Sequence, residues 1–305
     1  MKNMIAITAL AGLAAGASAQ LIAADSYNTA DYTLGGLNGQ NPNIAPGWTG
    51  AGSAAWSVGS ANLQADSISL TNSATAYDDA STGKGRYIAS SFDFYRAGHH
   101  KVDSYAAADT YYMSFFVNPG GDFTNTTGRD TAVVGFTNFF GSSAYNNTSA
   151  DNVYGLFAGF QGESAGAAAG EKDLILRARN SSGDLENTVL LANAQATTYH
   201  VLYKLEVNVG GGSIDRVTYW VNASDLSDEG AMTSSAIATG TVDTFAMDTN
   251  SRIDRTFVVS NQWSSSFFWD ETRLGYDLNS VTGIPTPGTA GLLGLAGVAA
   301  LRRRR

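Results

Sequence analysis

The sequence contains no cysteine, and this absence excludes three kinds of chemistry. Disulfide bonds, zinc sites built from thiolates and catalysis by a thiol nucleophile all require cysteine. A folded domain of this chain must therefore be held together by its apolar core. The 14 Tyr, 14 Phe and 5 Trp residues supply bulky side chains for such a core.

Basic residues are also scarce. The chain has 18 Lys and Arg against 27 Asp and Glu, which gives a formal net charge of -9 at pH 7. Lys2 and the arginines at positions 302–305 lie in two end segments that contain no acidic residue, so the body between them is still more acidic. Such a surface repels nucleic acid and anionic lipid. Nucleic acid is therefore not expected as a partner.

The N-terminus has the three parts of a secretory signal peptide. Lys2 provides the positive charge, Met4 to Ala15 form an apolar stretch, and Ala17-Ser18-Ala19 is a small-residue cleavage site. We therefore expect residues 1–19 to form a signal helix that signal peptidase removes. Gln20 would then be the first residue of the exported protein.

The last segment of the chain, residues 284–305, has the composition of a weak membrane stop. Pro285 and Pro287 favour an extended connector. The segment from Thr289 to Leu301 is uncharged and apolar, but shorter than the roughly 20 residues of a spanning helix. Four arginines then hold the end on the cytoplasmic side: Arg302, Arg303, Arg304 and Arg305. This predicts a short apolar helix that retains the protein temporarily at the inner membrane.

This order of features resembles the PEP-CTERM sorting signal of Gram-negative bacteria, which has a Pro-Glu-Pro motif, an apolar helix and an arginine cluster. Pro285, Thr286 and Pro287 form a variant of the motif, because Thr286 replaces the Glu. The resemblance implies processing by an exosortase-like enzyme and a location in the cell envelope or outside the cell. A plain tail anchor with basic stop residues is the alternative.

The body of the chain, residues 20–283, is predicted to be one all-β domain. Short runs of apolar and β-branched residues alternate with turn residues, at Tyr87–Phe94, Thr110–Asn118, Ala132–Asn138, Val153–Phe160, Leu174–Ala178, Thr188–Ala192, Tyr199–Val209, Ile214–Asn222, Arg255–Ser260 and Phe267–Gly275. Val201, Tyr203 and Leu205 face one way and His200, Leu202, Lys204 and Glu206 face the other. This alternation indicates a half-buried strand, and the run from Ile214 is expected to complete a hairpin with it.

Helices of ordinary length are not expected in the body. One short helical turn is predicted within residues Asp225 to Met232, capped by Ser224 or Asp225. Many short strands with loop-rich connections favour an antiparallel β-sandwich or jelly roll.

Several short segments support a more specific fold. They are Leu37-Asn38-Gly39-Gln40, Pro46-Gly47-Trp48, Tyr219-Trp220-Val221-Asn222 and Trp269-Asp270-Glu271. In this order they resemble secreted bacterial β-sandwich domains related to the concanavalin A/laminin-G lectin-like fold, which frequently carry PEP-CTERM tails. The resemblance implies a lectin-like jelly roll, but it assigns no ligand because fold does not imply function.

No catalytic set is recognisable. Asp270 and Glu271 are adjacent, so in a regular strand they point to opposite faces and cannot serve one glycosidic bond together. His99 and His100 form a pair in a segment expected to be solvated. His200 lies on the outward face of its strand, with no serine or cysteine partner recognisable. The sequence therefore predicts a protein that is not an enzyme.

Two weaker hypotheses concern ligands. Aspartates in loops favour a structural calcium ion, with Asp225, Asp228 and Asp270 as ligands and Asp78, Asp79 and Asp93 as further candidates. Trp220 alternates with the inward-facing Tyr219 and Val221, which places it on the outward face of its strand as a candidate for stacking on a sugar ring. Packing in the core beneath a covering loop is the favoured interpretation, and the ligand platform is the alternative.

Taken together, these features predict an exported protein of the cell envelope or extracellular matrix, with a non-enzymatic structural or adhesive role. A carbohydrate-binding module that recognises exopolysaccharide is the main alternative. A polysaccharide-active enzyme is the third.

Overall fold

The structure is a computed structural model that describes residues 21–25, 35–36, 57–58, 63–65, 86–89, 96–101, 109–119, 131–137, 155–162, 172–179, 185–195, 197–211, 214–245, 255–261 and 266–282. Side chains are described for residues 109–119, 132–136, 155–161, 172–178, 186–195, 197–210, 214–244 and 269–282. The expected signal helix, the cleavage residues Ala17, Ala19 and Gln20, and the tail at 284–305 with its apolar helix lie outside the described residues.

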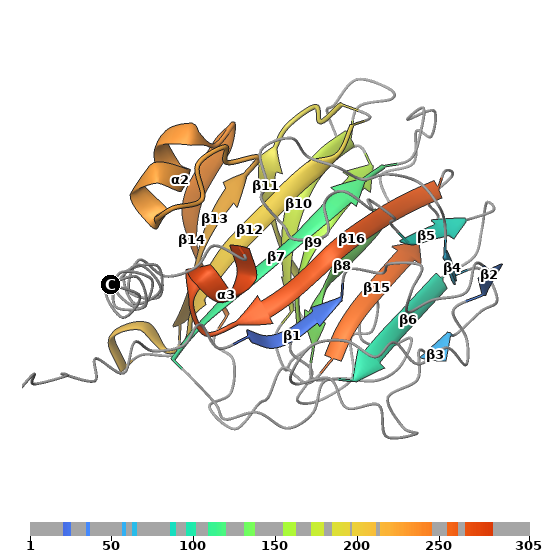
Figure 1. Ribbon diagram of the computed structural model, residues 1–305, viewed down its shortest axis with the longest axis horizontal. Helices are drawn as coiled ribbons and strands as arrows, with labels where there is room; N and C mark the ends of the chain where they lie inside the picture. The colour runs from blue at the N-terminus through green and yellow to red at the C-terminus, as the bar shows by residue number, and fades with distance from the viewer. Residues whose placement is uncertain are drawn as a thin grey trace, which may run out of the picture.

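Two antiparallel sheets form the domain, which confirms the prediction of an all-β sandwich (Figure 1). Sheet A has the strand order β14-β13-β12-β7-β16-β5-β4-β2, with β1 also paired to β16. Its strands are β1 (Leu21–Asp25), β2 (Gly35–Gly36), β4 (Leu63–Ala65), β5 (Arg86–Ala89), β7 (Thr110–Asn118), β12 (Tyr199–Glu206), β13 (Ile214–Val221), β14 (Ala238–Phe245) and β16 (Ser266–Gly275).

Sheet B has the order β11-β10-β9-β8-β15-β6-β3. Its strands are β3 (Ser57–Val58), β6 (Arg96–Lys101), β8 (Thr131–Thr137), β9 (Gly155–Gly162), β10 (Lys172–Arg179), β11 (Leu185–Leu191) and β15 (Arg255–Asn261). The hairpin expected from the alternating pattern is confirmed, because β12 pairs with β13 from Val201 opposite Val221 to Glu206 opposite Arg216.

The main core lies between the two sheets and follows directly from alternation along the strands. Every second residue of β7, β12 and β13 enters it from sheet A, and every second residue of β8, β9 and β10 enters it from sheet B. Aromatic rings pack across it; those of Phe115 and Tyr203 meet edge to face with centroids 5.8 Å apart.

A second, smaller apolar cluster lies on the outer face of sheet A, the face turned away from sheet B. It consists of Tyr112, Leu202, Trp220, Ala223, Leu226, Met232 and Val281. Met232 belongs to α2 (Glu229–Ser235) and Val281 to α3 (Leu278–Thr282). Both helices therefore lie against this outer face (Figure 1). The short helix η1 (Val209–Gly211) follows β12.

The start of α2 differs from the expected position. Asp228 is its N-cap, and its carboxylate accepts a hydrogen bond from the backbone N–H of Ala231 at 2.8 Å. Ser224 and Asp225 are not the caps, because the chain between Asn222 and Ser227 is still extended or turning when it leaves β13. None of the helices in the described part of the chain is long and apolar enough to span a membrane.

Strand β16 contains an irregularity that the sequence pattern did not reveal. Its pairing with β7 shifts register between Asp270 and Arg273, and Glu271 has a φ of 49°. Such a bulge bends the strand and re-aims its side chains. The expectation of a regular strand, with Asp270 and Glu271 on opposite faces, therefore does not apply at this point.

Candidate functional site

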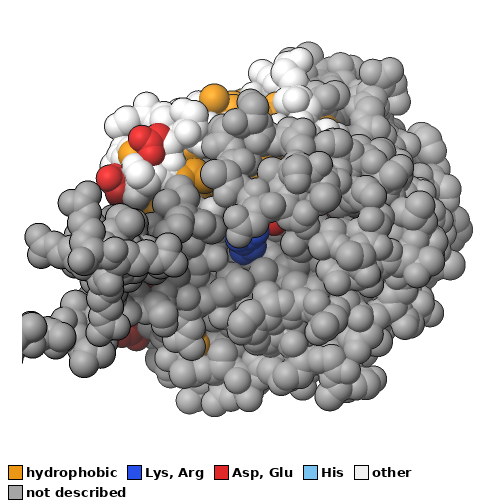
Figure 2. Space-filling view, in the orientation of Figure 1, with side chains coloured by type: hydrophobic (Ala, Val, Ile, Leu, Met, Phe, Trp, Pro, Cys, Tyr) orange, Lys and Arg blue, Asp and Glu red, His pale blue; other side chains and the backbone are white. Residues whose placement is uncertain are grey.

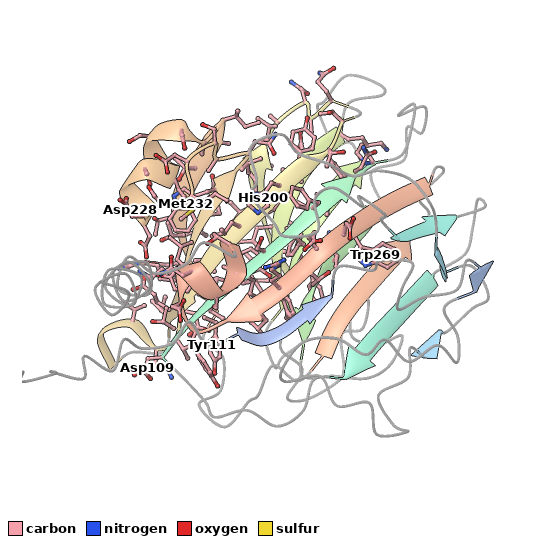
Figure 3. All side chains as sticks on the ribbon, in the orientation of Figure 1. Asp109, Tyr111, His200, Asp228, Met232 and Trp269 are labelled. Atoms are coloured by element: carbon pink, nitrogen blue, oxygen red, sulfur yellow. The ribbon has the colours of Figure 1, made fainter. Side chains whose placement is uncertain are left out.

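Trp220 packs in the core, as the favoured interpretation held, and does not face solvent as a ligand platform would. Its side chain is on the outer face of sheet A as the alternation predicted, but it is only 1% exposed. Helix α2 covers it, and its indole N–H donates a hydrogen bond to Thr233 Oγ1 at 2.9 Å. Figure 3 shows Met232 of α2 in the same region, over the strands of sheet A. Trp220 is thus a core residue of the outer cluster.

The three aspartates proposed as calcium ligands each receive a backbone N–H. Asp225 accepts from Ser227 at 3.0 Å, Asp228 accepts from Ala231 at 2.8 Å, and Asp270 accepts from Glu271 at 2.8 Å. Among the residues described, no three Asp, Glu or His side chains are grouped to hold a metal ion. The three named residues do not fit a shared calcium site. Asp78, Asp79 and Asp93 lie outside the described residues.

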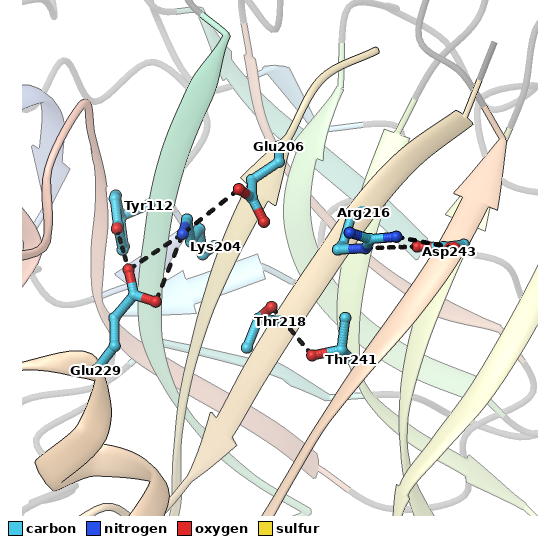
Figure 4. Close-up of polar contacts among 8 residues, drawn as sticks. All are labelled: Tyr112, Lys204, Glu206, Arg216, Thr218, Glu229, Thr241 and Asp243. Atoms are coloured by element: carbon cyan, nitrogen blue, oxygen red, sulfur yellow. Dashed lines mark hydrogen bonds and ion pairs between the residues drawn. The ribbon is translucent and has the colours of Figure 1, made fainter. Parts of the chain in front are cut away.

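A network of charged and phenolic groups attaches α2 to sheet A (Figure 4). Tyr112 of β7 donates its hydroxyl proton to Glu229 Oε1 at 2.5 Å. Lys204, directly opposite Tyr112 on β12, places Nζ 3.2 Å from Glu229 Oε1 and 3.5 Å from Glu206 Oε1. Burial, followed by the bond to Glu229, raises the pKa of Tyr112. The phenol therefore stays protonated and keeps donating at physiological pH.

Replacement of Tyr112 by phenylalanine is expected to lower the free energy of unfolding by about 1–2 kcal/mol, because it removes a hydrogen bond to a charged acceptor. Urea unfolding at neutral pH measures the change. Thr241→Val is the matched control, since Thr241 shares only an exposed hydroxyl contact with Thr218, at 3.2 Å. The control should change stability by less than about 0.5 kcal/mol. Equal effects in both variants would contradict the role assigned to Tyr112.

His200 has a serine partner that the sequence did not reveal. Its Nε2 lies 2.9 Å from Ser114 Oγ, and its ring packs on Phe116 with centroids 4.9 Å apart. Burial, and then the positive charge of Arg273, lowers the pKa of His200 to about 3. A neutral imidazole beside a hydroxyl is the arrangement of a base and a nucleophile. However, Ser114 is 0% and His200 1% exposed, so the pair is a buried element of sheet A.

An ion pair lies beside this histidine on β16. The guanidinium of Arg273 is 3.1 Å from Glu271 Oε2, and both side chains are largely buried. On the face shown in Figure 2, a basic side chain with an acidic one beside it is visible near the centre, and acidic side chains are also visible where α2 lies. The described part of this outer face is therefore occupied by paired charges and by two covering helices, which serve the stability of sheet A.

The outer face of sheet B carries a different arrangement, which we call the arginine network. Arg177 of β10 donates from Nε to Asn187 Oδ1 of β11 at 2.6 Å, and from Nη2 to Gln161 Oε1 of β9 at 3.2 Å. Arg177 is 6% exposed, and burial lowers its pKa to about 10. The amide oxygens of Asn187 and Gln161 orient the guanidinium. Asn187 is exposed and Gln161 half-buried.

A glycine makes room for this network. Arg177 and Gln161 lie on neighbouring strands, and the register position between them on β9 is Gly159, opposite Ile175. Gly159 has a φ of +156°, and a Cβ there would lie 2.1 Å from the carbonyl oxygen of Ala132. A side chain at this position is thus excluded. The space between Arg177 and Gln161 therefore contains no side chain from β9.

The arginine network is part of a register row that crosses all of sheet B. Each residue of the row is paired to the next, in the order Ser57, His99, Phe257, Gly135, Phe157, Arg177 and Asn187. Direct partners in adjacent strands occupy the same face of a sheet. The row therefore places polar, aromatic and basic residue types on one face, from β3 to β11.

The residues of the arginine network were not identified from the sequence. Arg177 interrupts the apolar run Leu174–Ala178, and that interruption was the available signal. Its partners Gln161 and Asn187 come from β9 and β11, and only the pairing of these strands brings them together. The predicted residues Trp220, Asp225 and Asp228 do lie near one another, around α2, whereas Asp270 belongs to β16.

Comparison with known proteins gives matches to solved structures alone. No protein-family model and no curated protein sequence matches the chain. A mutant of alginate lyase Aly36B in complex with alginate trisaccharide is 13% identical, with 84% of this chain and 99% of that chain covered and a TM-score of 0.44. Alginate lyase vAL-1 from Chlorella virus is 9% identical, with 71% and 93% covered and a TM-score of 0.40. The Emp47p carbohydrate recognition domain is 11% identical, with 82% and 96% covered and a TM-score of 0.40.

These likenesses concern the fold and assign neither a ligand nor a reaction to this chain. They accord with a lectin-like β-sandwich and include both carbohydrate recognition domains and polysaccharide lyases. The expectation that the protein is not an enzyme is contradicted by this comparison, because several of the similar structures are alginate lyases. The absence of a recognisable catalytic motif did not justify that exclusion.

Proposed function

We propose that the protein recognises polysaccharide at the edge of sheet B, where the exposed Asn187 and the half-buried Gln161 of the arginine network would contact the ligand and the buried Arg177 would hold them in position. The observation that carries the proposal is the guanidinium of Arg177, held by the amide oxygens of Gln161 and Asn187 at 3.2 and 2.6 Å. Guanidinium and amide groups are the side chains best suited to hydrogen-bond the hydroxyl and carboxylate groups of sugars.

The rigidity of the site supports this proposal. Its three side chains stand on the adjacent strands β9, β10 and β11, of which β11 is an edge strand, and sites on strands hold their geometry better than sites on loops. A guanidinium already fixed in direction loses little conformational freedom when a ligand arrives. Asn187, which is exposed, would meet the ligand first.

The two end segments of the chain support a location outside the cytoplasm, where the protein would meet polysaccharide. The signal-peptide pattern at residues 1–19 supports export, and the tail at 284–305 supports retention at the envelope followed by processing by an exosortase-like enzyme. Polysaccharide outside the cell would then be the partner of the sandwich domain. The similar structures, which include carbohydrate recognition domains and alginate lyases, accord with such a partner.

Cleavage of the bound polysaccharide is a second candidate function. It is favoured by His99, which occupies the same register row as Arg177. Histidine is the side chain whose ordinary pKa lies closest to neutral pH, so it suits proton transfer to and from a sugar.

The test measures binding of the purified protein to a panel of neutral and acidic polysaccharides. Asn187→Ala is expected to weaken binding about threefold to tenfold, since it removes one neutral hydrogen-bonding group that is exposed. Arg177→Lys keeps the charge but loses the planar fork, and is expected to weaken binding more strongly. Arg216→Gln is the matched control, because Arg216 lies on the outer face of sheet A in an exposed pair with Asp243.

The results of this binding test distinguish polysaccharide binding from polysaccharide cleavage. Failure of the wild-type protein to bind any polysaccharide, or equal loss of affinity in Asn187→Ala and in the control, would contradict the proposed site. New reducing ends or a falling chain length in the same samples would assign the second candidate. Bound chains of unchanged length would exclude it for those polymers.

A further inference from the structure

The arginine network fixes the orientation of two side-chain amides at the edge of sheet B. Arg177 donates from Nε to Asn187 Oδ1 at 2.6 Å and from Nη2 to Gln161 Oε1 at 3.2 Å. A guanidinium has N–H donors and no acceptor, so each amide must turn its oxygen toward Arg177. The NH2 group of each amide therefore points away from the guanidinium. Because Asn187 is exposed, its NH2 group can meet a ligand.

The groups that these two amides offer to a ligand are hydrogen-bond donors. Among the described residues, no acceptor meets the NH2 group of Asn187 or of Gln161. Donors are best matched by an oxygen that only accepts, such as a carbonyl or carboxylate oxygen, whereas a sugar hydroxyl donates as well. The arrangement therefore favours a sugar that carries a carbonyl or carboxylate group.

An exposed apolar side chain lies beside the donor of Asn187. Val189 is two positions further along β11, opposite Ile175, and is 47% exposed. Alternate residues of a strand share a face and lie about 6.8 Å apart. Of the exposed large apolar side chains in the described part of the chain, Val189 is the one on sheet B. Ligand sites combine apolar surface with a few polar groups in this way.

The charges near these amides argue against a carboxylate as the group that is recognised. Asp173 is the direct cross-strand partner of Gln161, and the chain as a whole has a net charge of -9. Both raise the energy of an anionic ligand. Arg177 is 6% exposed and uses Nε and Nη2 on the two amides, so a carboxylate would meet the amides and not the guanidinium. A neutral group with an accepting oxygen fits better.

We propose that this site recognises an acetylated sugar. The acetyl carbonyl oxygen would accept a hydrogen bond from the NH2 group of Asn187, and the acetyl methyl group would contact Val189. This inference rests on the proposed polysaccharide-binding function and adds the chemical class of the ligand. An acetyl group is neutral, its oxygen does not donate, and its oxygen and methyl group are attached to one carbon. It can therefore reach both side chains at once, and N-acetyl and O-acetyl groups share this chemistry.

The experiment measures binding of matched oligosaccharides by calorimetric titration. Chitohexaose, a hexamer of N-acetylglucosamine, and cellohexaose, the glucose hexamer with the same linkage, differ in the acetamido group of each ring. Chitohexaose is expected to bind at least about tenfold more tightly, the effect of one or two hydrogen bonds and an apolar contact. Xylan oligosaccharides with and without O-acetyl groups distinguish ester-linked from amide-linked acetyl. An alginate hexamer tests the carboxylate.

Three variants locate the acetyl group on the protein. Asn187→Asp keeps an oxygen for Arg177 but replaces the outward NH2 group with a second oxygen, so it should bind chitohexaose roughly tenfold more weakly. Its free energy of unfolding should be equal or higher, because the bond to Arg177 becomes charge-assisted. Val189→Thr keeps the branched shape and should weaken binding about threefold. Arg216→Gln makes the same change in net charge as Asn187→Asp, on the outer face of sheet A, and should bind like the wild type.

The results separate this inference from the proposed function. Cellohexaose or the alginate hexamer bound as tightly as the acetylated sugars would overturn the acetyl inference and leave polysaccharide binding standing. A preference for acetylated sugars that Asn187→Asp and Val189→Thr do not change would place the acetyl group elsewhere and would also overturn it. So would an equal loss in Arg216→Gln, which would show an effect of net charge. Absence of binding to every oligosaccharide would contradict the proposed function as well.

Discussion

Trp220→Ala is expected to lower the free energy of unfolding by about 3–5 kcal/mol. The indole is 1% exposed and packs in the outer cluster of sheet A with Leu202 and Met232. Its removal leaves a cavity under α2 and breaks the bond to Thr233. Urea unfolding followed by circular dichroism measures the loss. Trp220→Phe, which keeps a ring but not the N–H, is expected to cost less.

The same two variants test whether Trp220 is a core residue or a residue that stacks on a sugar ring. A tryptophan that stacks on sugar would lose binding when it is replaced, with little change in stability. A buried tryptophan on sheet A should change stability and leave polysaccharide affinity on sheet B unaltered. Trp220→Phe provides a folded protein for this comparison. Loss of binding without loss of stability would contradict the position described here.

Acidification is expected to destabilise the protein through His200. The pKa of this imidazole is about 3 in the folded protein, against about 6.5 in an unfolded chain. Between these values the unfolded state takes up a proton that the folded state does not, so stability falls as pH decreases. The contribution should be about 1.4 kcal/mol per pH unit, or about 2 kcal/mol between pH 6.5 and 5. Below about pH 3 the folded state is protonated as well, and the loss stops.

His200→Gln is the control for this dependence. Glutamine can still reach the hydroxyl of Ser114, but it does not titrate. The difference in unfolding free energy between wild type and variant should therefore shrink from pH 6.5 to pH 5. His99 and His100 are present in both proteins and cancel in the difference. Parallel stability curves for the two proteins across this range would show that His200 is not buried as a neutral group.

The sequence was most informative where the alternation of side chains along a single strand was enough to predict that strand. Alternation over β12 and β13 predicted the hairpin, the buried set with Val201 and Tyr203, and the outward set with His200. Side-chain periodicity determines which face a residue is on. It does not determine whether that face is exposed to solvent, because helices or loops from elsewhere in the chain can pack against it. Trp220 and His200 were therefore placed on the correct face, but the helix that covers Trp220 and the serine partner of His200 were not predicted.

Other features depend on partners that no local pattern contains. The cap of α2 was assigned to Ser224 or Asp225 although Asp228 satisfies the same rule, since several acceptors precede this helix. The bulge at Glu271 interrupts a strand whose composition is ordinary. The arginine network requires the pairing of three strands, β9, β10 and β11. Strand β14 was missed because its alternating Thr residues carry little apolar signal.

The pairing of β1 with β16 has a consequence for the order of folding. Leu21 lies opposite Gly275, so the first described strand pairs with the last described one. Contacts between such distant segments form slowly, because a long loop must close before they are gained. In the export that we propose, β1 would cross the membrane before β16 and would stay unpaired until the end of the sandwich emerges. Sheet A would then be completed only when translocation of the domain is nearly finished.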